Sequence, residues 1–136
     1  MKKVMVFGTF DILHRGHEYV LKQAKKYGDY LVAVAARDTN VRKIKGRAPL
    51  NNEKTRVRNL KKLGLADKAR LGYVRDPYKV ITEEKPNVIA LGYDQKEFVE
   101  GLKRFKNVKI VRLKAFKPNI YKSSKMRNEK NSYCDK

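Results

Sequence analysis

Short apolar runs alternate with longer amphipathic stretches along the whole chain. The apolar runs predict strands at Lys3–Phe7, Tyr30–Ala36, Lys68–Gly72, Val88–Leu91 and Lys109–Leu113. The amphipathic stretches predict helices at about Gly16–Lys26, Asn52–Leu63, Pro77–Glu84, Gln95–Lys106 and Ser123–Lys130. Apolar strands that alternate with helices are typical of a buried parallel sheet. We therefore predict an α/β fold with a doubly wound, parallel five-stranded sheet.

Local signals support this arrangement and a single domain. Proline suits the first turn of a helix, so a helix is predicted to begin at Pro77. Asp76, which directly precedes it, is a favourable N-cap residue. No internal repeat or low-complexity linker interrupts the 136 residues, a length that suits one domain. We expect residues 1–127 to form this domain and the polar residues 128–136 to form a C-terminal tail.

The composition narrows the functional classes. Lys and Arg number 34 against 14 Asp and Glu, which gives a formal net charge of +20. Nucleic-acid binding, a lysine-rich surface, or a site for highly phosphorylated small substrates would each explain this excess. Because the basic residues are spread along the chain, we favour the last two explanations. Cys134 is the only cysteine, so a disulfide framework is excluded and the cytoplasm is the expected compartment.

One stretch carries the strongest chemical signal, Gly8–His17 (GTFDILHRGH). It joins the first predicted strand to a helix, whose N-terminus offers backbone N–H groups and the positive end of a dipole to an anion. His14 and His17 are the only histidines and lie three residues apart, a spacing that can place both imidazoles on one side of the helix. With two histidines and one cysteine, a zinc site is not expected. The stretch therefore predicts a phosphate-binding site.

The same stretch resembles the GxFDxxHxGH signature of the cytidylyltransferase-like nucleotidyltransferases, and the similarity runs from Lys3 to about Arg127. Within that family the resemblance is greatest to the archaeal FAD synthase branch. It implies a Rossmann-like fold and catalytic roles for His14 and His17 at the phosphates. It also implies nucleotide contacts from signature residues, namely Thr9, Phe10, His14, Arg15, Gly16 and His17. For Asp11, which also belongs to the signature, we expect a role in the turn and not in metal binding.

A basic segment, Val41–Arg47, follows the second predicted strand. Most such runs are solvated loops, but this one lies on the edge of the sheet where doubly wound folds bind ligands. We expect a flexible loop that closes over a triphosphate and neutralises the departing pyrophosphate. Lysines here approach phosphates in the family that the chain resembles, which implies catalytic roles for Lys43 and Lys45. The resemblance likewise implies a phosphate-facing Arg56 at the start of the next helix.

Two more segments follow later strands on the same predicted edge. After the fourth strand comes G-Y-D-Q, a form typical of the FAD synthase branch, and the resemblance implies that its Asp94 touches the nucleotide. Near the end of the chain, Ser123 and Ser124 stand at a predicted helix start, where hydroxyl and N–H groups bind anions. The resemblance assigns triphosphate contacts to both serines and a place beside the nucleoside to Tyr121.

Together these residues predict a nucleotidyltransferase of the EC 2.7.7 class. A phosphate of an acceptor would attack the α-phosphorus of a nucleoside triphosphate, and pyrophosphate would leave. The resemblance favours ATP as donor and FMN as acceptor, which gives FAD. Two alternatives stay open: cytidylyl transfer from CTP to glycerol 3-phosphate or another small phosphorylated alcohol or sugar, and a basic nucleic-acid-binding module without catalysis. Helix-turn-helix and RNA-stacking signals are not evident, so nucleic acid is the less favoured partner.

Cofactor and partners follow from the same interpretation. The expected cofactor is a divalent cation. Mg²⁺ is favoured because it usually accompanies nucleotide phosphates, and no metal-binding residue is assigned. No membrane partner is expected, because no stretch approaches the roughly 20 apolar residues of a membrane span. Related enzymes are often dimers, so the resemblance allows a homodimer.

Overall fold

A computed structural model describes residues 1–76, 78–92, 95 and 99–114 of the chain. Its strands are β1 (Lys3–Gly8), β2 (Tyr30–Ala35), β3 (Lys68–Leu71), β4 (Val88–Leu91) and β5 (Lys109–Arg112). Its helices are α1 (Arg15–Lys25), α2 (Asp38–Lys45), α3 (Glu53–Leu63), α4 (Lys79–Glu84) and the 3₁₀ helix η1 (Val99–Arg104). Each predicted strand is confirmed to within one residue at either end.

The strands form one parallel sheet in the order β3-β2-β1-β4-β5. β1 is the central strand: Val4 pairs with Leu31 of β2 on one side and with Val88 of β4 on the other. The strand order reverses beside β1, because the chain moves outward through β2 and β3 before it returns to form β4. In doubly wound sheets ligands bind at this switch point, outside the carboxyl ends of the strands. The predicted fold class is therefore confirmed.

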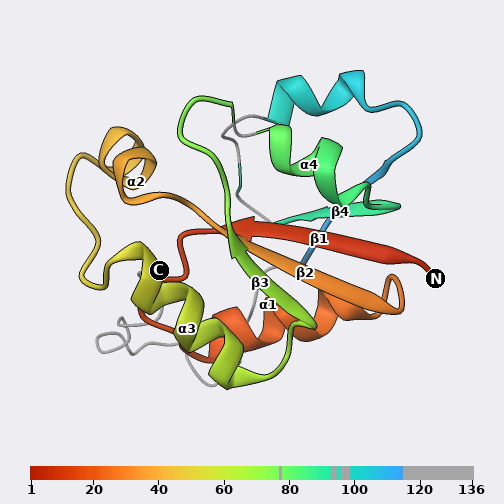
Figure 1. The fold of residues 1–136 in the computed structure, drawn as a ribbon. Coiled ribbons are helices and arrows are strands. Elements are labelled where there is room, and N and C mark those ends of the chain that lie inside the picture. The colour runs from red at the N-terminus through yellow and green to blue at the C-terminus, as the bar shows by residue number, and fades with distance from the viewer. Residues whose placement is uncertain (77, 93–94, 96–98, 115–136) are drawn as a thin grey trace.

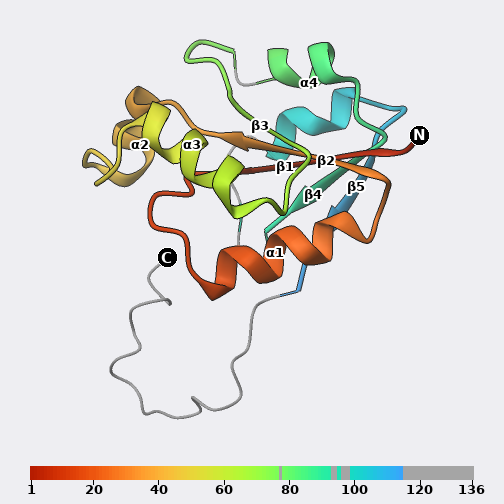
Figure 2. The ribbon, with the colours of Figure 1, turned by 60° about the horizontal axis from the view of Figure 1, so that its bottom comes forward.

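Helices cover both faces of the sheet. Figures 1 and 2 show α1 and α3 on one face and α4 and η1 on the other, and two separate clusters of buried side chains lie beneath them. Alternate residues of one strand serve opposite faces: Val4 and Val6 belong to the cluster under α1 and α3, and Met5 to the cluster under α4. All three are at most 1% exposed. Burial on both faces explains why the strands read as continuous apolar runs.

The bounds of α3 agree with the prediction because its caps are local. Asn52 precedes the helix, and its Oδ1 accepts a hydrogen bond from the Thr55 N–H (2.8 Å). Gly64 ends the helix with φ 75°, a left-handed conformation that glycine adopts without steric cost. Signals that lie within a few residues of each other can be read from the sequence directly.

The later helices differ more from their predicted ranges. α4 begins at Lys79, two residues after Pro77, and its N-cap residue is Tyr78. Asp76 still acts at this end, because its carboxylate accepts a hydrogen bond from the Tyr78 N–H (3.0 Å). Within the described residues, the 3₁₀ helix η1 stands in place of the helix predicted at 95–106, and the helix predicted at 123–130 lies outside the described residues. No helix in the described part of the chain is both long and apolar enough to cross a membrane.

α2 corrects the expectation of a flexible loop at Val41–Arg47. The segment is an eight-residue helix that begins at Asp38, and Figure 1 shows it beyond the carboxyl ends of β1 and β2. Its ends follow ordinary rules: an acidic residue lies in the first turn, basic residues lie in the last turn, and Gly46 ends the helix with φ 76°. The segment is rich in charged residues, so its short amphipathic helical pattern was not recognised in the sequence. The single buried residue of this helix is Val41.

An ion cluster joins α4 to the edge of the sheet where the strands begin. Glu84, the last residue of α4, is 6% exposed. Its carboxylate pairs with three cations of the sheet, Lys3 (3.3 Å), Lys68 (2.7 Å) and Arg70 (2.9 Å). Burial by itself would raise the pKa of Glu84, but hydrogen bonds from these cations outweigh burial and lower the pKa to about 2. The cluster therefore stabilises the fold above pH 4.5, the ordinary pKa, and loses this contribution as the pH falls toward 2.

Removing the charge of Glu84 should reveal this contribution. We expect Glu84→Gln to lower the free energy of unfolding at pH 7 by about 3 kcal/mol, because three cations lose their counter-charge. The difference from wild type should shrink as the pH falls below 4.5, since wild-type Glu84 then becomes protonated. Urea denaturation at pH 7, 4 and 2.5 measures both effects.

The control for this experiment is Glu100→Gln. Glu100 pairs with Lys103 on the surface, where ion pairs contribute little, so this variant should keep wild-type stability. A Glu84→Gln effect of the same size at all three pH values would contradict the assignment to ionised Glu84.

Candidate active site

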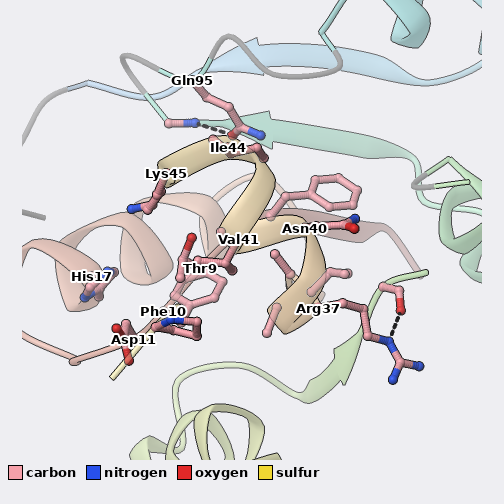
Figure 3. Close-up of a pocket in the computed structure, with 18 of the residues that line it drawn as sticks. Thr9, Phe10, Asp11, His17, Arg37, Asn40, Val41, Ile44, Lys45 and Gln95 are labelled. Atoms are coloured by element: carbon pink, nitrogen blue, oxygen red, sulfur yellow. Dashed lines mark hydrogen bonds between the residues drawn. The ribbon is translucent and has the colours of Figure 1, made fainter. Parts of the chain in front are cut away.

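A cavity of about 1140 Å³ lies at the carboxyl ends of the strands. Residues at the ends of β1, β2 and β4 line its floor, and its walls come from the loop after β1, from α2, and from the connection between α2 and α3. Figure 3 shows Thr9 of the loop after β1, His17 of the first turn of α1, and Asn40 and Lys45 of α2 around one space. The cavity thus gathers, at the switch point of the sheet, segments that are far apart in the sequence.

The two histidines cap α1 reciprocally. Nδ1 of His14 accepts a hydrogen bond from the Gly16 N–H (3.0 Å), and Nδ1 of His17 accepts one from the His14 N–H (3.3 Å). A neutral imidazole that accepts at Nδ1 carries its proton at Nε2. The caps therefore orient both rings as Nε2–H donors, with ring centroids 4.2 Å apart, and both residues line the cavity. A pair of donors held in this way suits the oxygens of a phosphate.

Gly16 and Phe10 fix the position of these rings. A Cβ atom at Gly16 would lie 2.8 Å from Cε1 of His14, so glycine is needed to leave room for the capping imidazole. Phe10 is 4% exposed, and its ring centroid lies 5.6 Å from that of His17. It also holds φ 52°, a left-handed conformation that costs a bulky residue about 1–3 kcal/mol and that core packing must enforce. Arg15 is exposed and, like Gly16, does not line the cavity.

Asp11 joins two walls of the cavity. Its carboxylate accepts hydrogen bonds from the backbone N–H groups of Leu50 (2.7 Å) and Asn51 (2.8 Å). Its carbonyl oxygen also accepts a hydrogen bond from Nδ2 of Asn51 (2.7 Å). Both carboxylate oxygens are engaged by backbone N–H groups, so Asp11 acts here as a link between the loop after β1 and the α2–α3 connection.

Arg56 lies beneath the cavity, and this corrects its expected phosphate-facing position. Its side chain is fully buried, and its guanidinium donates to the carbonyl oxygens of Thr9 (2.7 Å) and Asn51 (3.1 Å). A third bond, from Nη2, reaches Oδ1 of Asp38 (2.7 Å). The three acceptors belong to the loop after β1, the α2–α3 connection and the start of α2. One planar, permanently charged group therefore ties three segments of the cavity together.

Carboxylates at the starts of α2 and α3 cap each other's helix. Oε1 of Glu53 accepts a hydrogen bond from the Asp38 N–H (2.9 Å), and Oδ2 of Asp38 accepts one from the Glu53 N–H (3.2 Å). Each carboxylate satisfies a helix-start N–H and interacts favourably with the positive end of a helix dipole. Arg37 completes the junction by donating to Oε2 of Glu53 (3.0 Å) and to the carbonyl oxygen of Gly72 after β3 (2.8 Å). Contacts between distant segments therefore set the position of α2.

α2 turns one face toward the cavity. The residues of α2 that line it are Asn40, Val41, Ile44 and Lys45, and the N-cap residue Arg37 lines it as well. Lys43 does not line the cavity, because residues two apart on a helix point about 200° away from each other. Figure 3 shows the Lys45 side chain extending toward the side on which His17 lies. Of the two lysines that the resemblance assigns, the structure brings only Lys45 to the cavity.

The cavity residues that precede this lysine were not predicted from the sequence, because a loop was expected in place of α2. Arg37 and Asn40 became candidates only once α2 placed them on the same face as Lys45. A signal was present in the sequence: Asp38 follows a strand, and Gly46 follows a run of cations, which is the usual charge order of a helix with its C-cap.

Gly92 and Gln95 complete the cavity on the β4 side. Arg112 of β5 braces this segment, because its Nη1 donates to the carbonyl oxygens of Gly92 (2.9 Å) and Gln95 (2.6 Å). Four residues that the resemblance assigns to the nucleotide lie outside the described part of the chain, namely Asp94, Tyr121, Ser123 and Ser124. Their contacts stay predictions.

Comparisons with a family model and with known proteins point to the same family. The model of the cytidylyltransferase-like family matches residues 5–129. An FAD synthase from Thermoplasma acidophilum is 40% identical over 134 residues, which cover 95% of this chain and 94% of the relative. An FAD synthase from Archaeoglobus profundus is 47% identical over 130 residues, which cover 91% of this chain and 82% of the relative.

Solved structures agree with this result. A protein from Thermoplasma volcanium, described as a lipopolysaccharide core biosynthesis protein, superposes with a TM-score of 0.77 at 43% identity and covers 85% of this chain and 98% of its own. A pantoate-β-alanine ligase from Francisella tularensis, solved with β,γ-ATP and β-alanine, gives a TM-score of 0.56 at 19% identity. This alignment covers 82% of this chain and 58% of the ligase, and at that identity it shows a shared fold alone.

Replacing Arg56 should test whether it holds the cavity together. We expect Arg56→Lys to lower the free energy of unfolding by about 3 kcal/mol, because an ammonium cannot reach three acceptors in fixed directions and leaves part of the buried network unpaired. Urea denaturation measures the change. Arg58→Lys, an exposed position on the same helix, is the matched control and should leave stability unchanged. Equal stability of the two variants would contradict the bracing role.

Proposed function

The chain belongs to the cytidylyltransferase-like family, and on this premise we propose that it acts as an FAD synthase, which transfers the AMP part of ATP to FMN. The proposal is supported by relatives of that name that align along most of the chain at 40% to 47% identity. The observation that carries it in the structure is the pair of histidines held as Nε2–H donors at a cavity that Lys45 also lines.

The reaction needs orientation and charge stabilisation more than a covalent nucleophile. An oxygen of the FMN phosphate attacks the α-phosphorus of ATP, and the bond from that phosphorus to the oxygen bridging to the β-phosphate breaks. A new P–O–P linkage joins FMN to AMP, and pyrophosphate leaves with the electron pair of the broken bond. Negative charge grows on the oxygens of the α-phosphate and on the leaving group. Donors fixed before the reaction stabilise this charge without reorganisation.

Different residues of the cavity orient the phosphates and stabilise their charge. His14 and His17 donate from Nε2 to oxygens of the α-phosphate, which orients it and stabilises its charge during transfer. Lys45, at the end of α2, neutralises the departing pyrophosphate. Thr9 and Phe10 border the nucleotide, as the resemblance implies. Lys43 and Arg56 take no direct part in this scheme, since neither lines the cavity.

Mg²⁺ fits this site as a partner of the nucleotide. No group of three His, Cys, Asp or Glu side chains in residues 1–76, 78–92, 95 and 99–114 could hold a metal ion, and the carboxylate of Asp11 is engaged by backbone N–H groups. Mg²⁺ usually binds through substrate phosphates with few protein carboxylates, so this donor set suits an ion that enters with ATP. When bound, the ion would neutralise charge on the phosphates.

A matrix of donors and acceptors tests the proposed function. Purified protein is offered ATP or CTP, each with FMN, glycerol 3-phosphate or phosphopantetheine, and the release of pyrophosphate is measured. We expect release with ATP and FMN, together with the appearance of FAD. His17→Ala, in the same assay, should lose at least about 100-fold in kcat, because one preorganised donor to the transition state is gone. Release only with CTP and an alcohol phosphate would refute the assignment.

The two lysines of α2 give a second prediction. We expect Lys45→Ala to lower kcat/KM for ATP by about 100-fold, because a cation at the departing pyrophosphate is lost. Lys43→Ala removes the same charge two residues away, outside the cavity, and should cause a much smaller loss. Steady-state kinetics of the two variants, with circular dichroism to verify that the helix is retained, provide the measurement. Similar losses in both variants would show that overall charge, and not the cavity position, is what counts.

A further inference from the structure

Three large aliphatic side chains stand exposed around the cavity. Ile12, Ile44 and Leu50 are 55%, 54% and 79% exposed, and each lines the cavity. They come from three segments, the loop after β1, α2 and the α2–α3 connection. Exposed apolar groups that gather at a cavity mark a site for a ligand with apolar surface. We call these three residues the apolar rim.

The scaffold holds the segments that carry the apolar rim. Asp11 binds the Leu50 N–H, which fixes Leu50 to the loop that carries Ile12. Arg56 binds Asp38 at the start of α2, the helix that carries Ile44. The rim is therefore a built feature of the cavity. Phosphate and ribose groups are polar and gain little from such a surface, so a different part of a substrate must account for it.

Asn40, which also lines the cavity, has an unused acceptor. Its Nδ2 donates to the carbonyl oxygen of Tyr73 (3.3 Å), whereas its Oδ1 is buried and has no hydrogen-bond partner among the described residues. Asn40 and Ile44 are one turn apart on the cavity-facing side of α2. Buried acceptors are nearly always paired in folded proteins, so this one points to a ligand with an N–H group.

The apolar rim suits the apolar end of a flavin ring, and the unused acceptor of Asn40 suits the polar end. Resting on the proposed function, we propose that the apolar rim and Asn40 form the subsite for the isoalloxazine ring of FMN. The rim contacts the dimethylbenzene end of the ring, and Oδ1 of Asn40 accepts a hydrogen bond from N3–H at the pyrimidine end. The nucleotide occupies the β4 side, next to Gly92 and Gln95. This arrangement leaves the FMN phosphate to reach His14 and His17.

Replacing rim residues tests the apolar half of the subsite. Ile12→Ser and Ile44→Ser should each weaken FMN binding about tenfold, measured by the change in flavin fluorescence on titration, and should leave the KM for ATP within about twofold of wild type. Ile110→Ser is the matched control: Ile110 is 38% exposed on β5 and does not line the cavity, so FMN binding should stay unchanged. Rim variants that bind FMN as wild type does, or that raise the KM for ATP instead, would overturn the subsite.

A modified ligand tests the polar half. FMN methylated at N3 lacks the N–H group, so wild-type protein should bind it about tenfold more weakly than FMN. Asn40→Ala should bind the two ligands equally, because the partner of that N–H is gone, and this equality distinguishes a direct contact from a structural role of Asn40. An undiminished preference for FMN over its methylated form in Asn40→Ala would overturn the assignment.

Two further measurements separate the other outcomes. Wild-type protein that forms no FAD from ATP and FMN would refute the proposed function, whereas active wild type whose rim variants bind FMN normally would refute only the subsite. Sedimentation of wild type, Ile12→Ser and Ile44→Ser tests whether the rim is instead an interface between two copies of the chain. Dissociation of a dimer by these variants with FMN binding intact would overturn the flavin subsite.

Discussion

A buried guanidinium is the interaction on which the candidate site depends. Burying a charge is unfavourable unless the charge is paired and hydrogen-bonded, and Arg56 meets both conditions through one carboxylate and two carbonyl oxygens. The acceptors lie on Thr9, Asp38 and Asn51, which belong to three different segments of the chain. Without a central donor, the loop after β1, the start of α2 and the α2–α3 connection would have no common anchor. The cavity walls are consequences of this network.

The network also decides which charges face the cavity. The carboxylates of Asp11, Asp38 and Glu53 accept hydrogen bonds from backbone N–H groups or arginines of the scaffold. The acidic groups nearest the site are thus engaged in holding it. Lys45 and two histidines face the cavity, in a chain with a net charge of +20. Such a field attracts anionic substrates, including the ATP and FMN of the proposed reaction, and this would give the charge excess a physical use.

Local signals explain most of what could be predicted from the sequence. Strands buried on both faces appear as apolar runs, and the histidines of α1 stand in a motif whose caps involve neighbours two or three residues away. α2 could not be predicted from the sequence for two reasons. Its apolar face has only two residues, and the group that caps its start is the side chain of Glu53, which belongs to the next helix. The choice between Lys43 and Lys45 depended on that helix, since a loop gives no periodicity from which to choose.

The sequence by itself determined the sheet, its parallel class and the histidine-bearing stretch after β1, because each depends on residue type and short-range spacing. Only the tertiary structure decided that Arg56 is a buried brace, that α2 presents Lys45 to the histidines' cavity, and that three aliphatic residues gather around one opening. The physical reason is the same in each case. A guanidinium's partners and a cavity's lining come from segments far apart in the chain, and distances between such segments are properties of the folded packing alone.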